Sequence, residues 1–273
     1  MGYVLGVDIG STATKIVVLN AQRQPVVMDR MSASDPKASL FAAVGSVLYD
    51  LGIAVSEVEA LMMTGMGASY IKGDVLGIPV RKVTEFDALG AGGLYLSGKT
   101  EAIVTSIGTG TTVVYAGPEG RVHMGGSAVG GGTLTGLCSR LFGIRETDII
   151  SEMADRGDLK NVDWGIAELS CEDMPSLPDY ATSSNLGKMK STATDDDVAL
   201  GLLNMIYQTS GTMAVFACRN KGLREVVMVG GLCCLHHAGI MLGRVGELYG
   251  IDFMIPDHAA YATALGAAML YYE

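Results

Sequence analysis

The chain has 273 residues, which is enough to bury a large core as one big domain or as two lobes. Hydrophobic residues make up 49% of it, yet 37 glycines and many small residues interrupt the apolar runs before any reaches the length of a membrane span, so we expect a soluble protein. A net charge of -10 disfavours nucleic acids and anionic membranes as partners.

The N-terminus and the cysteines indicate a cytoplasmic protein. No basic segment precedes the first apolar run, so no signal peptide is expected. Cys138, Cys171, Cys218, Cys233 and Cys234 form an odd set without CxxC spacing, which argues against a disulfide framework. We therefore expect reduced thiols.

Residues 4–19 contain two apolar runs around a small polar turn, a pattern that predicts a β-hairpin. Glycine, hydroxyl groups and turn N–H groups can cradle an anion, a lysine can reach a phosphate, and an aspartate at a strand end can hold a hydrated divalent cation. An Asp-x-Gly turn is also a common hairpin solution without any ligand, and this alternative stays open. The residues predicted to contact a nucleotide and its metal here are Asp8, Gly10, Ser11, Thr12 and Lys15.

The next segments predict a mixed sheet with helices packed on it. We expect a third strand over residues 26–31, a helix over 40–48, a strand over 59–65, a helix over 68–76 and a short strand over 79–83.

Thr84 is well placed as the N-cap of a helix that continues to residue 96. Glu85 and Asp87 then lie in its first turn. From the residues alone, these two carboxylates are explained by the helix dipole, a contribution of about 0.3 to 1 kcal/mol.

Residues 101–115 repeat the pattern of a strand, a Gly/Thr turn and a second strand. Two such turns that face each other across a cleft are what a duplicated, two-lobed phosphate-binding fold supplies to one ATP. Gly108 and Gly110 are the glycines of this second turn. Residues 130–132 are three glycines before a helix, and a helix N-terminus of this kind is a ready anion site.

The chain from residue 144 to residue 197 is less informative. We expect a polar helix over residues 144–157, an irregular stretch over 158–179 and a lid or loop over 180–187. Residues 195–197 are three aspartates, which we interpret as an acidic cap of a helix over 198–220. We favour this cap over a metal site because consecutive helical residues point in different directions.

Residues 225–232 predict a buried strand that ends in a Gly-Gly pair, where the backbone could lie against adenosine. The following residues, 233–237, are Cys-Cys-Leu-His-His. We do not favour a zinc site there, because adjacent cysteines cannot easily share a tetrahedral ion and no distant pair of ligands is evident. A last strand over 251–255 and a helix over 262–271 complete the chain.

Several of these motifs together resemble those of the actin-like ATPase, sugar kinase and Hsp70 superfamily, and more narrowly those of the type II pantothenate kinases. The resemblance runs in order over nearly the whole chain. It implies an α/β, actin-like ATPase (ribonuclease H-like) fold with two similar lobes of mixed sheets flanked by helices, divided into residues 1–97 and 98–273. The segments that carry the resemblance are Asp8–Thr12, Glu85–Ala88, Gly108–Thr111, Gly130–Cys138, Met153–Asp158, Ala181–Gly187 and Val229–Gly231.

The resemblance implies ATP-dependent phosphorylation of pantothenate to 4′-phosphopantothenate, the first step of coenzyme A synthesis, with ATP and Mg²⁺ as cofactors and a homodimeric assembly. Glu85 matches the general base of the family, and Asp8 is the expected metal ligand. The positions that match nucleotide contacts of the family are Lys15, Thr109, Gly131, Gly132, Thr133, Leu134, Thr135 and Gly231.

One departure from the family pattern concerns the substrate. The family usually has an arginine directly before its Val-Gly-Gly or Val-Ser-Gly turn, whereas this chain has His123. Arg121 lies two residues earlier and shares a face with His123 if the segment is a strand. We favour Arg121 as the partner of a substrate carboxylate, because a fixed charge and a bidentate fork suit that group. Thr111, Arg121 and His123 are the expected substrate contacts, and the substrate is pantothenate or another pantoyl-like alcohol.

Two other functions stay open. The opening hairpin also resembles that of the ATPase activators of 2-hydroxyacyl-CoA dehydratases, whose shared metal cluster needs cysteines around a dimer axis. Cys138 lies in the kinase-like helix and Cys171 in the irregular stretch, which disfavours this function. The third possibility is a catalytically silent ATP-binding regulator, suggested by His123.

Overall fold

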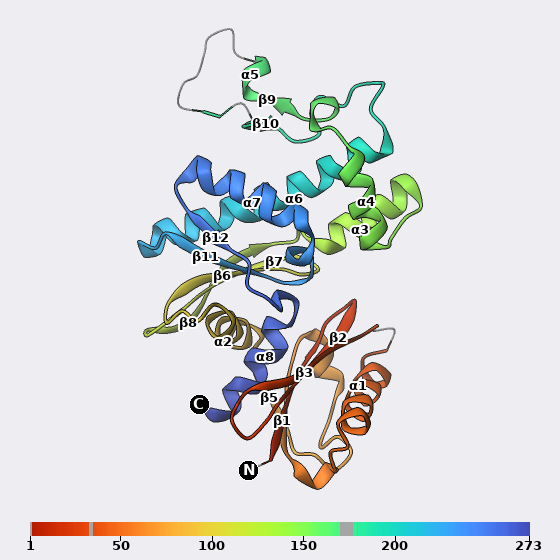
Figure 1. The fold of residues 1–273 in the computed structure, drawn as a ribbon, viewed down its shortest axis with the longest axis vertical. Helices are drawn as coiled ribbons and strands as arrows, with labels where there is room; N and C mark the ends of the chain where they lie inside the picture. The colour runs from red at the N-terminus through yellow and green to blue at the C-terminus, as the bar shows by residue number, and fades with distance from the viewer. Residues whose placement is uncertain (1, 33–34, 170–176, 179) are drawn as a thin grey trace.

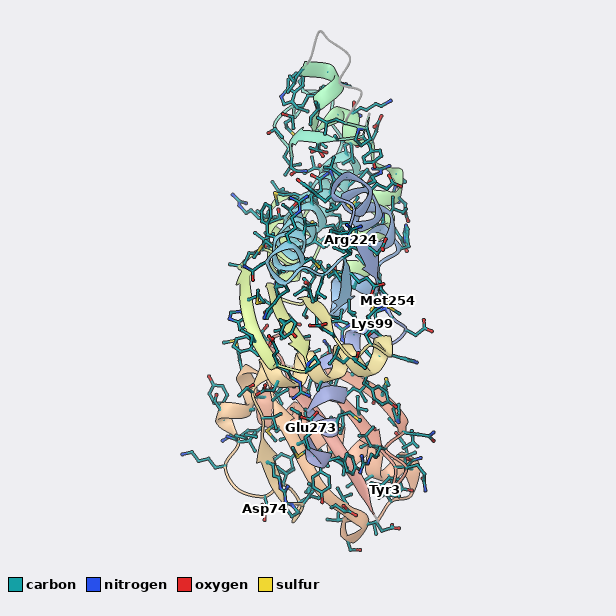
Figure 2. All side chains as sticks on the ribbon, turned by 90° about the vertical axis from the view of Figure 1, so that its left-hand side faces the viewer. Tyr3, Asp74, Lys99, Arg224, Met254 and Glu273 are labelled. Carbon is teal, nitrogen blue, oxygen red and sulfur yellow. The ribbon has the colours of Figure 1, made fainter. Side chains whose placement is uncertain are left out.

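The computed structural model describes residues 2–32, 35–169, 177–178 and 180–273. The molecule is elongated, with two lobes stacked along its long axis (Figure 1). Tyr3 and Asp74 lie in the lobe at one end, whereas Arg224 lies in the second lobe (Figure 2). No helix in the described parts of the chain is long and apolar enough to cross a membrane.

The first lobe contains a five-stranded mixed sheet in the order β3-β2-β1-β4-β5. Three antiparallel strands on one side are continued by two parallel ones. The predicted hairpin and the strands that follow it are confirmed. The strands are β1 (Tyr3–Ile9), β2 (Ala13–Leu19), β3 (Pro25–Ser32), β4 (Val58–Thr64) and β5 (Val80–Lys82).

The second lobe contains another five-stranded sheet, in the order β12-β11-β6-β7-β8. Read from the other edge, the order and the pairing directions are the same as in the first sheet. The fold is therefore duplicated, as the two similar turns predicted. The strands are β6 (Ala102–Ile107), β7 (Thr111–Gly117), β8 (Gly120–Ser127), β11 (Glu225–Val229) and β12 (Asp252–Met254).

Helix α1 (Pro36–Leu51) covers the outer face of the first sheet (Figure 1). The Asp35 carboxylate caps its N-terminus by accepting hydrogen bonds from the backbone N–H groups of Lys37 and Ala38, and Gly52 ends it in the left-handed conformation. Its apolar face, which includes Leu40 and Val44, joins the core under the sheet.

Helices α6 and α7 cover the face of the second sheet that points away from the first lobe (Figure 1). The helix predicted over residues 198–220 is present as α6 but begins three residues earlier, so the three aspartates form its first turn and do not precede it. Thr194 is the N-cap of α6, and Asp197 accepts a hydrogen bond from the Thr194 N–H. The remaining elements of this lobe lie beside or beyond these helices. These remaining elements are α3 (Gly131–Phe142), α4 (Thr147–Arg156), β9 (Trp164–Gly165), α5 (Ile166–Leu169) and β10 (Thr182–Ser184). The two covering helices are α6 (Asp195–Lys221) and α7 (His236–Tyr249).

Helices α2 (Glu85–Ser97) and α8 (Ala262–Met269) lie between the two sheets (Figure 1). They cross with their backbones in contact. A Cβ atom added at Gly92 would lie 1.8 Å from the Ala262 carbonyl oxygen, and one added at Gly266 would lie 1.8 Å from that of Ala88. Only glycine permits this approach.

Helix α8 packs on the first sheet, although it is the last helix of the chain. Leu265 and Ala268 of α8 share one hydrophobic cluster with Val4 of β1 and Val17 of β2. The boundary that we predicted at residue 97 stays a prediction, but residues 262–269 belong by their packing to the first lobe.

The helix predicted over residues 68–76 is wrong. A short 3-10 helix, η2 (Met66–Tyr70), is followed by a turn in which Val75 and Ile78 pair. Gly73 and Leu76 both have positive φ angles, of 71° and 54°, which a right-handed helix does not contain. The apolar spacing of this segment serves the packing of Ile71 and Val75 into the first core instead.

The contact between α2 and α8 generates a prediction about stability. Gly266→Ala should lower the free energy of unfolding by about 1 to 3 kcal/mol, because the added methyl group forces two backbones apart. Gly243→Ala in α7 is the matched control, since its Cβ meets open space and alanine favours a helix by roughly 0.5 to 1 kcal/mol. Denaturant unfolding of both variants checks this, and a Gly266→Ala protein as stable as the wild type would contradict the described crossing.

Candidate active site

The end of the first hairpin brings charged groups together on one face of the sheet. Asp8 of β1 lies opposite Lys15 of β2, and Thr64 of β4 is its neighbour on the other side. Side chains alternate along a strand, so Asp8 shares a face with Val4 and Lys15 shares one with Val17. This is the face that α8 covers. The charged pair therefore lies where the first lobe meets the second.

Glu85 is the first residue of α2, and the helix cap leaves its side chain free. The Thr84 hydroxyl accepts a hydrogen bond from the Asp87 N–H at 3.1 Å and donates one to the Asp87 carboxylate at 2.5 Å. The predicted N-cap is confirmed, and Asp87 is occupied by it. Partial removal from water and the negative charge of Asp8 raise the pKa of Glu85, while Lys15 opposes the shift.

Asp8 is enclosed where the strands end. Burial raises the pKa of its carboxyl group, with the charge of Lys15 acting in the opposite direction. A Cβ atom at Gly65 would lie 2.5 Å from Asp8 Oδ1, so the close approach requires glycine there. Asp8, Lys15 and Glu85 thus form one interacting charged group.

Asp8 and its neighbour Thr64 fit a magnesium ion. A carboxylate oxygen is the kind of ligand that Mg²⁺ takes from a protein when phosphates supply the others. Beside Asp8, the Thr64 hydroxyl is buried and has no hydrogen-bond partner among the described residues. Asp8, with Thr64 next to it, is therefore the candidate holder of the ion.

The turns of the two hairpins face each other and touch. The Ser11 and Thr109 hydroxyl groups lie 2.8 Å apart, within hydrogen-bond distance. Ser11 and Thr12 are exposed in the first turn, as is Thr109 in the second. The arrangement of two facing turns that the repeat predicted is therefore present, with Gly10 in one turn and Gly108 and Gly110 in the other.

The start of α3 is bound to the second turn. The N–H groups of Gly131 and Gly132 donate to the carbonyl groups of Gly108 and Thr109, each at 2.8 Å. A Cβ atom at Gly132 would lie 2.9 Å from Thr109 Cγ2. These two glycines were predicted as nucleotide contacts, but here their amides hold the turn in place.

The next three residues of α3 also make contacts within the protein. The Thr133 hydroxyl accepts from the Gly130 N–H at 3.2 Å and donates to the Ala128 carbonyl at 3.1 Å. The side chain of Leu134 is fully buried in the second core, so it presents nothing to a ligand. The Thr135 hydroxyl reaches the Gly132 carbonyl at 3.4 Å.

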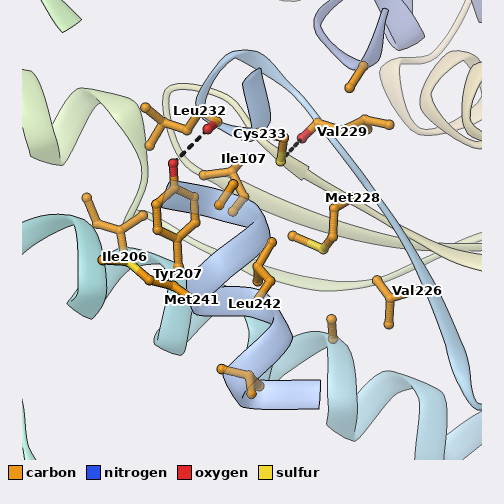
Figure 3. Packing of buried hydrophobic residues seen from close by; sticks show 14 of the residues in the cluster. Ile107, Ile206, Tyr207, Val226, Met228, Val229, Leu232, Cys233, Met241 and Leu242 are labelled. Atoms are coloured by element: carbon orange, nitrogen blue, oxygen red, sulfur yellow. Dashed lines mark hydrogen bonds between the residues drawn. The ribbon is translucent and has the colours of Figure 1, made fainter. Parts of the chain in front are cut away.

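The predicted adenosine side lies at the end of β11. Gly230 has a φ angle of 98°. A Cβ atom added at Gly231 would meet no atom within 4 Å outside its chain neighbours, so this backbone is open on that side. The 3-10 helix η4 (Gly231–Cys234) is fixed from below by the Tyr207 hydroxyl, which donates to the Leu232 carbonyl at 2.7 Å (Figure 3). A rigid, open backbone edge of this kind can lie against a flat ring.

Cys233 is part of this support and has no reactive character. Its thiol donates to the Val229 carbonyl at 2.9 Å (Figure 3), and burial raises its pKa to about 12. Cys138 is likewise buried, and burial raises its pKa to about 11. Neither thiol can reach a dimer axis at the surface, and Cys171 lies outside the described residues.

The predicted substrate residues occupy different places. Thr111 is buried, and its hydroxyl donates to the Val129 carbonyl at 2.8 Å and lies 2.8 Å from the Ser210 hydroxyl. It holds the loop before α3 and does not face a ligand. We therefore leave Thr111 out of the proposed substrate site.

Arg121 and His123 both lie on β8 and face α2, so the predicted strand is confirmed. The His123 ring stacks on Phe86 with a centroid distance of 4.1 Å and an interplanar angle of 9°. The Arg121 side chain lies beside Gly90, which is one turn of α2 further from Glu85 than Phe86 is. Its guanidinium forms a bidentate ion pair with Glu273 at 2.9 and 2.5 Å. Our preference for Arg121 over His123 is therefore not supported.

The segment predicted as a lid or loop over residues 180–187 lies far from the hairpins, at the outer end of the second lobe (Figure 1). It forms β10, which pairs with β9, and it lines a cavity of about 370 Å³ together with α6 and α7. Tyr180 and Asn185 are among the lining residues. The segment does not close over the two turns in this arrangement.

Comparison with known protein families places the chain. The sequence pattern described as Fumble matches residues 101–270. The chain belongs to the Fumble family. This assignment covers the second hairpin, the start of α3 and the Gly-Gly end of β11.

Relatives over the full length agree with the Fumble assignment. The type II pantothenate kinase of Staphylococcus aureus strain USA300 is 25% identical over 279 residues, which span 97% of this chain and 98% of that protein. The protein of the same name from strain NCTC 8325 matches equally well. The family predicted from the motifs is thereby confirmed.

Solved structures show the same fold at lower identity. The activator of the 2-hydroxyisocaproyl-CoA dehydratase from Clostridium difficile with bound ADPNP has a TM-score of 0.70 at 18% identity, covering 98% of this chain and 93% of that chain. A ROK family glucokinase from Streptomyces griseus in complex with glucose and AMPPNP has a TM-score of 0.64 at 13% identity, covering 98% and 99%. The actin-like ATPase fold expected for this Fumble protein is confirmed.

The charged group at the first hairpin predicts a nucleotide-binding defect. Lys15→Ala should weaken ATP binding about 10- to 100-fold, the value of one charge-assisted hydrogen bond. Lys160→Ala is the control, because this lysine is exposed in the second lobe. Calorimetric titration with a non-hydrolysable ATP analogue measures both, and equal affinities would remove Lys15 from the site.

Proposed function

We propose that the chain is an ATP-dependent kinase that phosphorylates the primary hydroxyl group of pantothenate or of a related pantoyl-like alcohol. The observation that carries the proposal is the position of Glu85, close enough to Asp8 and Lys15 for their charges to change its pKa. Asp8 and Lys15 lie near the end of the first hairpin, whose turn touches the second turn. The relatives named type II pantothenate kinase support the choice of substrate. We further propose that the protein acts in the cytoplasm as a homodimer.

The proposed reaction is an in-line transfer between two oxygen atoms. Glu85 accepts the proton of the substrate hydroxyl, the oxygen forms a bond to the γ-phosphorus, and the bond from that phosphorus to the β,γ-bridging oxygen breaks to release ADP. A raised pKa suits Glu85 to this role, because a stronger base removes the proton more readily.

The other groups stabilise charge and position. Lys15 would place a positive charge beside the phosphates, and the exposed residues Ser11, Thr12 and Thr109 offer hydroxyl groups to them. Mg²⁺, carried with ATP and held by Asp8, supplies further neutralisation of phosphate charge. Gly231 offers an open backbone surface for the adenosine.

His123 and Phe86 form the proposed substrate side. Phe86 directly follows Glu85, and its ring is stacked on His123, so the pair builds a flat surface next to the base. A ring N–H of His123 can donate a hydrogen bond to the carboxylate or amide oxygen of a pantoyl-like molecule. Arg121 is instead held by Glu273.

The proposed role of Glu85 predicts how its replacement by glutamine affects turnover. Glu85→Gln should lower kcat for pantothenate about 10²- to 10⁴-fold with little change in ATP affinity, because the amide keeps the volume but accepts no proton. Asp87→Asn is the control, since Asp87 serves the helix cap. An assay of ADP release measures both variants. Loss of turnover in Asp87→Asn together with retained turnover in Glu85→Gln would reassign the base.

The charges around Glu85 predict opposite shifts of the pH profile. The base works only when ionised, so kcat/KM should fall as the pH is lowered through the raised pKa of Glu85. Lys15→Met removes a charge that lowers this pKa and should move the fall to higher pH. Asp8→Asn removes a charge that raises it and should move the fall to lower pH. Shifts in the same direction, or none, would separate Glu85 from these neighbours.

The positions of His123 and Arg121 on β8 predict which of them affects substrate binding. His123→Ala should raise the KM for pantothenate with a smaller effect on kcat, the mark of lost uniform binding. Arg121→Ala should leave that KM within about twofold and act mainly on stability, because the Arg121 side chain is only 20% exposed and is paired with Glu273. Steady-state kinetics of the two variants decide between them, and the reverse pattern would restore Arg121 as the substrate partner.

A further inference from the structure

Three side chains that the proposed reaction does not use converge beside η4. Asp155 lies on α4, and His236 and His237 begin α7. Asp155 Oδ1 is 2.7 Å from His236 Nε2 and 3.1 Å from His237 Nε2. The potential ligand atoms of the three residues all lie within 4.8 Å of one another. The sequence showed no distant partner for the two histidines, because Asp155 is brought to them only by the packing of the helices.

The buried histidine of this group is held from behind. The side chain of His237 is 6% exposed, and its Nδ1 lies 3.4 Å from the Ser151 hydroxyl, which is also on α4. One ring nitrogen is thus occupied within the protein, while the other points at Asp155. A partner on the second nitrogen that fixes the ring is the arrangement found around metal-binding histidines.

The three groups can hold a positive charge at the point where they meet, supplied either by ring protons or by a metal ion. A carboxylate oxygen and two imidazole nitrogens each present a lone pair there unless the rings direct their protons to it. Imidazole nitrogens select zinc and similar ions over magnesium, which prefers oxygen ligands. Two histidines and one carboxylate are a common set of three protein ligands for Zn²⁺.

We propose that Asp155, His236 and His237 bind one Zn²⁺ ion, with a fourth position open to water. At Zn–N and Zn–O lengths of about 2.0 to 2.2 Å, tetrahedral ligand atoms lie roughly 3.3 Å apart, so the observed distances need to widen by only a fraction of an ångström. His236 and Asp155 are 59% and 47% exposed and can make this adjustment. The site is separate from Asp8.

The ion joins α4 to the start of α7. The helix α7 directly follows η4, whose first residue, Gly231, is the predicted adenosine surface. Zinc bound at this point therefore braces the turn from outside, while Tyr207 supports it from below. Binding of the ion stabilises the folded chain by mass action, independently of any kinase activity.

Zinc binding by the untagged, full-length chain tests the proposal. After treatment with a chelator, calorimetric titration with ZnCl₂ should show one site per chain. His236→Gln and Asp155→Asn change exposed ligands and should each weaken this site by more than the roughly 10- to 100-fold that is typical for loss of an outer partner. Ser151→Ala should weaken it within that range. His258→Gln and Cys234→Ser are controls that should bind as the wild type does.

Two further measurements, a Co²⁺ absorption spectrum and the melting temperature, identify the ligands. Co²⁺ in place of Zn²⁺ should give the visible bands of nitrogen and oxygen ligands without a strong thiolate charge-transfer band. Zinc should raise the melting temperature of the wild type but not of His236→Gln, and excess Mg²⁺ should not displace it. Unchanged affinity in both ligand variants, no saturable binding, or a thiolate band that disappears in Cys234→Ser would each overturn the proposal.

Discussion

The architecture of the molecule depends on the contact between α2 and α8. Their backbones meet at Gly92 and Gly266 with no room for a side chain, and this contact lies between the two sheets. The contact fixes α2 against the first lobe, while the side of α2 that carries Phe86 and Gly90 faces β8 of the second. One helix is thereby held by both lobes. Its first residue, Glu85, is positioned with respect to both hairpins at once.

The register of the first hairpin accounts for how an acidic protein could build the proposed ATP site. The net charge of the chain is -10, yet Lys15 is fixed opposite Asp8 by the register of two strands. Backbone geometry sets this pairing, so the lysine that we propose as a phosphate contact is held at a defined place. Burial and the charge of Asp8 raise the pKa of Glu85, a shift that suits the proton-accepting role proposed for it.

Much of the fold follows from local patterns in the sequence. Alternating apolar runs predicted both hairpins, their repetition predicted two similar lobes, and Thr84 marked the start of α2. The segment over residues 68–76 shows where this reasoning fails. Its apolar spacing suits a helix, but Gly73 and Gly77 adopt left-handed conformations and the segment folds as turns against the first core.

The parts of the site that could not be predicted depend on residues distant in the sequence. Arg121 was favoured for a substrate carboxylate, yet its partner is Glu273, and no local pattern reveals this pair. The N–H groups of Gly131 and Gly132 look like free anion donors until the second turn is placed against them. A sequence motif shows that N–H donors are present, but tertiary packing determines which of them remain free to bind a ligand.

The most direct test of this account is a crystal structure of the chain with a non-hydrolysable ATP analogue, Mg²⁺ and pantothenate. The account predicts phosphates between the turns that contain Ser11 and Thr109, Lys15 beside them, and the Glu85 carboxylate within hydrogen-bond distance of the primary hydroxyl. Pantothenate bound away from α2, or a nucleotide bound outside the two turns, would contradict it.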